Sequence, residues 1–156
     1  METKTPTAFF VYGTLKKSQL RGGLWPRRPL EILPAIIQAD LFDLGPYPAA
    51  AYGDNWLMGE IWQFKPDDMR ATIEALDHIE GYEALANDNE YLREIVTVEV
   101  QSEEATVTTK AYAYFAAQVA ELAIARPIQP WLQFLGRNVA AWPDARSRTP
   151  KSFAEE

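Results

Sequence analysis

One glutamate, Glu80, occupies a position where an amphipathic helix normally carries an apolar residue. The stretch from Pro66 to Tyr82 is typical of a single helix, because Pro66 with Asp67 is a start signal and Gly81 is a stop signal. At about 100° per residue, the core-facing stripe of this helix consists of Met69, Ile73 and Leu76. Glu80 falls within the same stripe, whereas Glu74 and His78 fall on the solvent side.

A carboxyl group held against the core loses hydration in its charged form, and its pKa rises. A carboxyl tuned in this way can accept and return a proton near neutral pH. We therefore predict that Glu80 has a raised pKa and serves as a general acid–base group. The alternative is that Glu80, in the last turn of its helix, extends past the helix end into water.

A second candidate for chemistry is the turn Tyr12-Gly13-Thr14-Leu15, which follows an apolar run. Successive backbone N–H groups at a glycine turn can form a concave anion site, and a residue without a side chain lets a ligand approach the backbone. The spacing is not that of a P-loop. An ordinary turn is the alternative interpretation.

Several kinds of catalytic site are excluded by composition. The 156 residues include no cysteine and one histidine, His78, which excludes thiol nucleophiles and argues against a Ser-His-Asp triad or a multi-histidine zinc site. Asp40 and Asp43 do not form a metal pair, since their odd spacing on a strand sends them to opposite faces. We expect no metal and no cofactor.

The net charge of −7 disfavours nucleic-acid binding. Residues 1–30 nevertheless carry six basic residues against the single acid Glu2, and a local positive field could attract a small anionic ligand. These residues are Lys4, Lys16, Lys17, Arg21, Arg27 and Arg28. There is neither a secretory signal nor an apolar run of membrane-spanning length, so we expect a cytoplasmic protein without a membrane partner. The oligomeric state stays open.

The pattern of apolar residues predicts an α+β fold with a small mixed, mostly antiparallel β-barrel flanked by helices. The predicted strands are Thr7 to Tyr12, Glu31 to Leu44 with a bend or break near Pro34, Leu57 to Phe64, Tyr91 to Gln101, and Thr106 to Phe115 after a hairpin turn at Ser102 to Ala105. The segment Pro46-Tyr47-Pro48 has restricted backbone freedom, which holds Tyr47 in a defined place.

We expect one domain over residues 1–143, with a core at 8–115, a helical C-terminal part at 116–143 and a flexible tail at 144–156. Within the C-terminal part, Gln118 to Ala125 is a candidate short helix. Pro130 to Ala141 is the better helix candidate, since Pro130 can initiate a helix. Its apolar face would consist of Trp131, Leu135 and Val139.

Six short motifs occur in a characteristic order between Ala8 and Phe115. They are Tyr12-Gly13-Thr14-Leu15, Leu41-Phe42-Asp43-Leu44-Gly45-Pro46-Tyr47-Pro48, Gly59-Glu60-Ile61-Trp62, Leu76-Asp77-His78-Ile79-Glu80-Gly81-Tyr82, Tyr91-Leu92-Arg93 and Ala111-Tyr112-Ala113-Tyr114. In this set the chain resembles the γ-glutamylcyclotransferase-like family.

The resemblance implies a small barrel with a cavity at one side. It implies that the loop of Tyr12, Gly13, Thr14 and Leu15 binds a γ-glutamyl group, and that Glu80 transfers the protons. We add Tyr47 and Tyr114, which stand in two of the motifs, as substrate-binding candidates. The implied reaction is intramolecular: the substrate α-amine attacks its own γ-amide carbonyl and releases 5-oxoproline and an amine, without a metal or covalent intermediate.

Three functions stay open at this point. The substrate is either a free γ-glutamyl amide or a biosynthetic intermediate from which a γ-glutamyl protecting group is removed. A non-catalytic module that binds a small ligand or a partner on the same barrel is the third. A buried carboxylate suits catalysis better than the binding of an acidic ligand. The sequence does not identify the leaving amine or a role for residues 116–156.

Overall fold

The computed structural model describes residues 5–44, 47–83, 89, 91–101, 105–117 and 125–147. Its secondary structure begins with three strands and then a helical segment. In order, the elements are β1 (Ala8–Val11), β2 (Glu31–Asp43), β3 (Pro48–Gln63), the 3-10 helix η1 (Pro66–Asp68), α1 (Met69–Glu80), β4 (Tyr91–Gln101), β5 (Thr106–Ala116), β6 (Arg126–Pro127), β7 (Leu132–Phe134) and β8 (Arg137–Val139).

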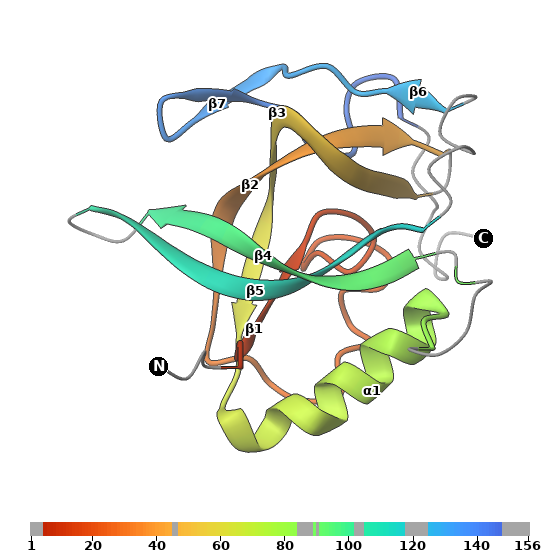
Figure 1. Ribbon diagram of the computed structural model, residues 1–156, viewed down its shortest axis with the longest axis vertical. Helices are drawn as coiled ribbons and strands as arrows, with labels where there is room; N and C mark the ends of the chain where they lie inside the picture. The colour runs from red at the N-terminus through yellow and green to blue at the C-terminus, as the bar shows by residue number, and fades with distance from the viewer. Residues whose placement is uncertain are drawn as a thin grey trace.

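The main sheet has six strands in the order β3-β1-β5-β4-β2-β6, and β3 also pairs with β2. The pairings of β3, β1, β5, β4 and β2 therefore run in a ring. Between named strands of the described chain, β1–β5 is the one parallel pairing, and the others are antiparallel. The predicted α+β fold with a mostly antiparallel sheet is confirmed. Figure 1 shows α1 along one side of this sheet, away from β6 and β7.

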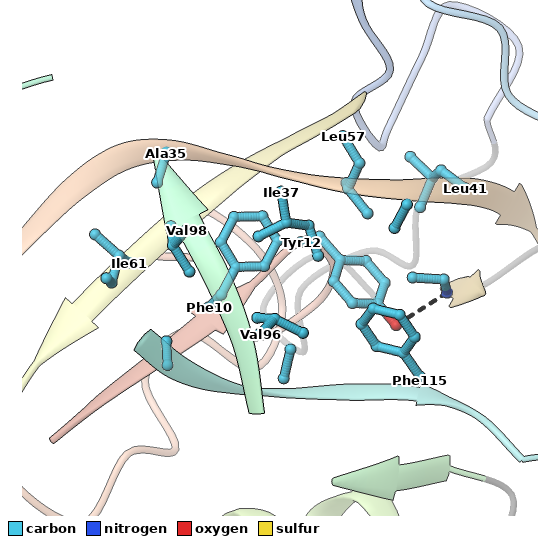
Figure 2. Close-up of a cluster of buried hydrophobic side chains, with 14 of the residues drawn as sticks. Phe10, Tyr12, Ala35, Ile37, Leu41, Leu57, Ile61, Val96, Val98 and Phe115 are labelled. Carbon is cyan, nitrogen blue, oxygen red and sulfur yellow. Dashed lines mark hydrogen bonds between the residues drawn. The ribbon is translucent and has the colours of Figure 1, made fainter. Parts of the chain in front are cut away.

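Strand β1 is buried on both faces, which explains why its sequence is a continuous apolar run rather than an alternating one. Phe10 on β1 and Tyr12, just after the end of β1, belong to a cluster on one face of the sheet. This cluster also contains Ile37, Leu57 and Phe115 (Figure 2). Phe9 and Val11 belong to a second cluster on the other face.

The second cluster joins α1 to the sheet. Met69 and Leu76 are buried in it and Ile73 packs against it, as the helical pattern predicts. Thr72 is also fully buried. Its hydroxyl group tolerates burial because it donates a hydrogen bond to the carbonyl oxygen of Asp68 at 2.7 Å. Glu74 and His78 are exposed, as expected.

Strands β2 and β3 differ from their predicted bounds. Strand β2 continues through Pro34, and its irregularity lies instead between Gln38 and Asp40. Strand β3 begins at Pro48 rather than Leu57. The carboxylate of Asp40 accepts hydrogen bonds from the backbone and side-chain N–H groups of Asn55, so a polar segment typical of a turn is held inside a long, bulged strand.

The predicted helix from Pro130 to Ala141 is wrong, because this segment forms the β7–β8 hairpin. Leu135 and Gly136 have φ angles of 51° and 76° at its two-residue turn, a left-handed conformation that a helix interior excludes. The i, i+4 spacing that suggested a helix is even, and strands also place residues at even spacing on one face.

The other C-terminal helix, Gln118 to Ala125, falls almost entirely outside the described residues, as do three residues of the turn at Ser102 to Ala105. The register of β4 and β5, which pairs Gln101 with Thr106, is that of a hairpin. In the described part, α1 is the one α-helix beside the sheet, so the expected set of flanking helices is reduced to one. No helix in that part has the length and apolar character needed to span a membrane.

Candidate active site

Glu80 is the last residue of α1. Gly81 follows with a φ of 69°, and the amides after the helix donate to the carbonyl oxygens of His78 at 3.2 Å and Asp77 at 2.8 Å. This left-handed cap ends the helix. Glu80 is half-buried rather than fully buried, because its side chain lies at a cavity.

The cavity next to Glu80 has a volume of about 260 Å³. This is slightly below the range of about 300–1,000 Å³ that is usual for small-molecule sites. All seven candidate residues from the sequence line it. The lining residues are Phe10, Val11, Tyr12, Gly13, Thr14, Leu15, Arg21, Tyr47, Pro48, Ile79, Glu80, Tyr91 and Tyr114. The fold thus brings the turn after β1, the start of β3, the end of α1 and strands β4 and β5 to one place.

Tyr12 is buried, and its hydroxyl group is engaged with the backbone. It donates to the carbonyl oxygen of Tyr114 at 2.5 Å and accepts from the amide of Ala50 at 3.1 Å. Burial raises the pKa of Tyr12, and the negative charge of Glu80 raises it further. Tyr12 is therefore a neutral phenol that fixes the start of the loop against β3 and β5.

A second network holds the end of α1. The hydroxyl of Tyr114 donates to Asp77 Oδ1 at 2.6 Å, and the other oxygen of Asp77 is ion-paired with Arg93. Burial, followed by the hydrogen bond to Asp77, raises the pKa of Tyr114. The Arg93 guanidinium lies 5.3 Å from the ring centres of both Tyr82 and Tyr112, a cation–π arrangement.

Gly13 is in close contact with the protein itself. A Cβ atom at this position would lie 2.8 Å from two ring carbons of Pro48, closer than carbon atoms pack. The sequence-based reason for the glycine, space for a ligand, is thus joined by a packing reason. Across the described residues, the amides of Gly13, Thr14 and Leu15 donate no backbone hydrogen bond to a protein acceptor.

Of the N-terminal basic residues that the structure describes, Arg21 is the one that lines the cavity. Lys16 extends elsewhere, and its Nζ atom donates to the carbonyl oxygen of Trp142 at 2.6 Å. Arg27 is 3.5 Å from Asp68, and Lys17 and Arg28 are exposed. The positive field predicted for the whole N-terminal segment is therefore represented at the cavity by one guanidinium group.

Comparison with known proteins identifies the family to which this chain belongs. The sequence profile described as gamma-glutamyl cyclotransferase, AIG2-like, matches residues 9–133. The chain belongs to this family. A comparison with curated protein sequences found no match.

Solved structures show the same fold. An AIG2-like protein from Mus musculus is 19% identical with a TM-score of 0.56, and the match covers 90% of this chain and 97% of that one. A yeast gamma-glutamyl cyclotransferase specific to glutathione is 12% identical with a TM-score of 0.52, covering 72% and 69%. YkqA from Bacillus subtilis is 23% identical with a TM-score of 0.53; the match covers 72% of this chain but spans only 36% of YkqA.

In this member of the gamma-glutamyl cyclotransferase family, sequence reasoning missed part of the cavity and its support. Tyr91 stands in a motif that carries the resemblance and lines the cavity, but it is not among the seven candidates from the sequence. Its hydroxyl donates to the carbonyl oxygen of Pro48 at 2.9 Å, and its ring packs edge-on against Tyr47 at 6.3 Å. The Asp77–Arg93 ion pair was also missed. Asp77 follows the buried Leu76 in α1, and a charged residue beside a buried one can indicate that it has a partner on a neighbouring element.

Chemically, the cavity of this family member combines opposite charges with neutral phenols. Among the described lining residues, Glu80 is the one carboxylate and Arg21 the one permanent cation. The raised pKa values of Tyr12 and Tyr114 keep both phenols protonated, so neither is available as a general base. No group of three potential metal-binding side chains occurs in the described ranges. The raised pKa expected for Glu80 stays a prediction, as do the roles assigned to the site residues.

Proposed function

We propose that this protein is an enzyme that cyclises a γ-glutamyl amide to 5-oxoproline and releases the amine. The observation that carries the proposal is that Glu80 and the loop of Tyr12 to Leu15 line one small cavity in a member of the gamma-glutamyl cyclotransferase family. The ring of strand pairings supports the finer description of the fold as a small barrel with this cavity at its side.

Glu80 acts first as a base in this proposal. Its carboxylate takes a proton from the substrate α-ammonium group, and the resulting amine attacks the γ-carbonyl carbon. A C–N bond forms, the carbonyl electron pair moves to oxygen, and a five-membered tetrahedral intermediate results. Amine and carbonyl belong to one molecule, so the enzyme must hold the chain folded rather than bring two reactants together.

Glu80 then acts as an acid. It gives its proton to the departing nitrogen as the original amide C–N bond breaks and the carbonyl re-forms. Its carboxylate, free again, then takes the second proton from the ring nitrogen and passes it to the released amine. Overall, two protons leave the α-nitrogen and two reach the departing nitrogen. A single carboxyl group can carry protons in both directions in turn.

The amides of Gly13, Thr14 and Leu15 are suited to the developing oxyanion or to a substrate carboxylate. They donate to no backbone acceptor among the described residues, and Gly13, Thr14 and Leu15 all line the cavity. Backbone N–H groups fixed in this way stabilise negative charge without reorganising during the reaction. Tyr12 and Tyr114 keep the loop and the end of α1 in place.

The decisive experiment is a substrate screen with the purified full chain. γ-Glutamyl amines, γ-glutamyl amino acids and larger γ-glutamylated intermediates are incubated with the protein, and 5-oxoproline is quantified by mass spectrometry. Enzyme-dependent release supports the proposal, and the best substrate separates a free amide from a protecting group. Compounds that bind without release would instead support the non-catalytic ligand-binding module.

A further inference from the structure

Arg21 is held beside the cavity by its own backbone. Its amide donates to the carbonyl oxygen of Thr14 at 2.7 Å, and its carbonyl oxygen accepts from the amide of Leu24 at 3.0 Å. The first of these bonds links Arg21 directly to the loop that lines the cavity. The position of the residue therefore does not depend on a bond made by its side chain.

Within the described residues, the guanidinium group of Arg21 forms no hydrogen bond and no ion pair with the protein. This differs from the other arginines near the site and the sheet. Arg27, Arg93 and Arg126 are each paired with an aspartate. Arg21 is also half-buried rather than extended into water.

A half-buried guanidinium without a counter-charge, at a cavity whose one described carboxylate is needed for proton transfer, suits an anionic ligand group. Resting on the proposed function, we infer that Arg21 binds a carboxylate of the γ-glutamyl substrate. Two carboxylates fit this chemistry: the α-carboxylate of the γ-glutamyl group and a carboxylate on the leaving amine.

Two matched substrates distinguish these carboxylates. L-γ-Glutamylglycine and L-γ-glutamyl methylamide share the γ-glutamyl group, but only the first has a carboxylate on the leaving amine. Steady-state kinetics are measured on both with Arg21→Gln, Arg21→Lys and, as a matched control, Lys17→Gln. Lys17 is an exposed cation on the same loop whose side chain is not part of this cavity.

Arg21→Gln should raise KM by about 10- to 100-fold, the value of a hydrogen-bonded ion pair, with kcat changed far less. A loss confined to γ-glutamylglycine assigns the leaving-group carboxylate, and an equal loss on both assigns the α-carboxylate. Arg21→Lys should restore part of the effect, since it keeps the charge but not the planar fork. Lys17→Gln should leave both substrates unaffected.

Unchanged KM for both substrates in Arg21→Gln, with wild-type melting temperature, would overturn the inference. Calorimetric titration of the same two compounds separates this from failure of the proposed function. If the wild-type chain releases no 5-oxoproline, the inference still requires that it bind at least one compound and that Arg21→Gln weaken that binding about tenfold or more. Absence of binding, or equal binding by both proteins, would refute it.

Discussion

The carboxylate of Asp77 on α1 accepts a hydrogen bond from the Tyr114 hydroxyl on β5 at 2.6 Å and forms an ion pair with Arg93 on β4. It therefore fastens the last turns of the helix to two strands. Glu80 lies three residues further along the same helix, so the position of its carboxyl group at the cavity depends on this attachment.

Asp77→Asn should lower both stability and turnover. The variant leaves Arg93, whose side chain is 23% exposed, without its counter-charge. We expect a loss of about 1–3 kcal/mol in the free energy of unfolding, reduced by partial exposure, and a fall in kcat because Glu80 is less well positioned. Urea unfolding and 5-oxoproline kinetics measure the two effects. Tyr114→Phe removes one hydrogen bond to Asp77, so we expect a loss of about 1 kcal/mol in the free energy of unfolding. Wild-type stability and kcat in Asp77→Asn would contradict the role of Asp77 in attaching α1 to the two strands.

Glu80→Gln should abolish most turnover without unfolding the protein. The amide keeps the size of the side chain but cannot accept the ammonium proton, so kcat should fall by roughly 10²–10⁴. Glu74→Gln is the matched control, because Glu74 is exposed on the same helix, 3.5 Å from Arg70. Kinetics and thermal melts on the same preparations decide the matter. Near-wild-type kcat in Glu80→Gln would end the catalytic assignment, and a large fall in melting temperature would indicate a structural role.

Gly13→Ala should destabilise the turn even without substrate. Its Cβ would lie 2.8 Å from Pro48 Cγ and Cδ, and such overpacking costs about 1–3 kcal/mol. Pro48 also lines the cavity, so KM should rise as well. Gly23→Ala is the control, since a Cβ there meets nothing within 4 Å. A Gly13→Ala protein with the melting temperature and KM of Gly23→Ala would show that the contact is unimportant.

The Asp144–Arg126 pair should make stability depend on pH. Hydrogen bonds from Arg126 hold the pKa of Asp144 well below its usual range, and the Asp144 side chain is 13% exposed. A lowered folded-state pKa stabilises the fold above the unfolded value, near 3.9 for aspartate, and this contribution is lost as the pH falls through the folded pKa.

Asp144→Asn should therefore cost about 1–3 kcal/mol at pH 7, and the difference from wild type should shrink below about pH 4. Unfolding by urea at a series of pH values measures this difference. Asp67→Asn, an exposed site on η1 with no ion pair to a described residue, is the control. A difference for Asp144→Asn that stays constant from pH 7 to pH 3 would refute the linkage.

Catalysis should not require a metal ion. The chain has no cysteine, and its one histidine is exposed, so the proposed proton transfers rest on Glu80. Dialysis against EDTA should leave the rate of 5-oxoproline formation unchanged. Activity that is lost on dialysis and restored by zinc or magnesium would contradict this prediction.

Local patterns predicted the parts of the site that lie within short segments. The period of the helix singled out Glu80, because one carboxylate interrupts a stripe that packs on the sheet. The turn of Tyr12 to Leu15 was recognisable because β1 is an apolar run that ends at a glycine turn. Each of these signals depends on residues within a few positions of one another, which is why the sequence alone carries them.

The sequence was misleading where local patterns fit two structures. The segment from Pro130 to Ala141 has even spacing compatible with a helix face or a strand, and its pairing across the Leu135-Gly136 turn decided for a hairpin. Strand β3 was predicted to begin at Leu57, whereas it begins at Pro48. The contact of Asn55 with Asp40 on β2 holds the polar residues before Leu57 in the sheet.

The sequence by itself determined the candidates for the chemistry: one carboxylate in a helix stripe and one glycine turn, in a chain with no thiol and one histidine. Tertiary structure decided what surrounds them. The selection of Arg21 from several basic residues, the contact of Gly13 with Pro48 and the attachment of Asp77 to Tyr114 and Arg93 all join residues from different elements. Such contacts depend on strand pairing and on packing of α1 against the sheet, and no local sequence pattern specifies them.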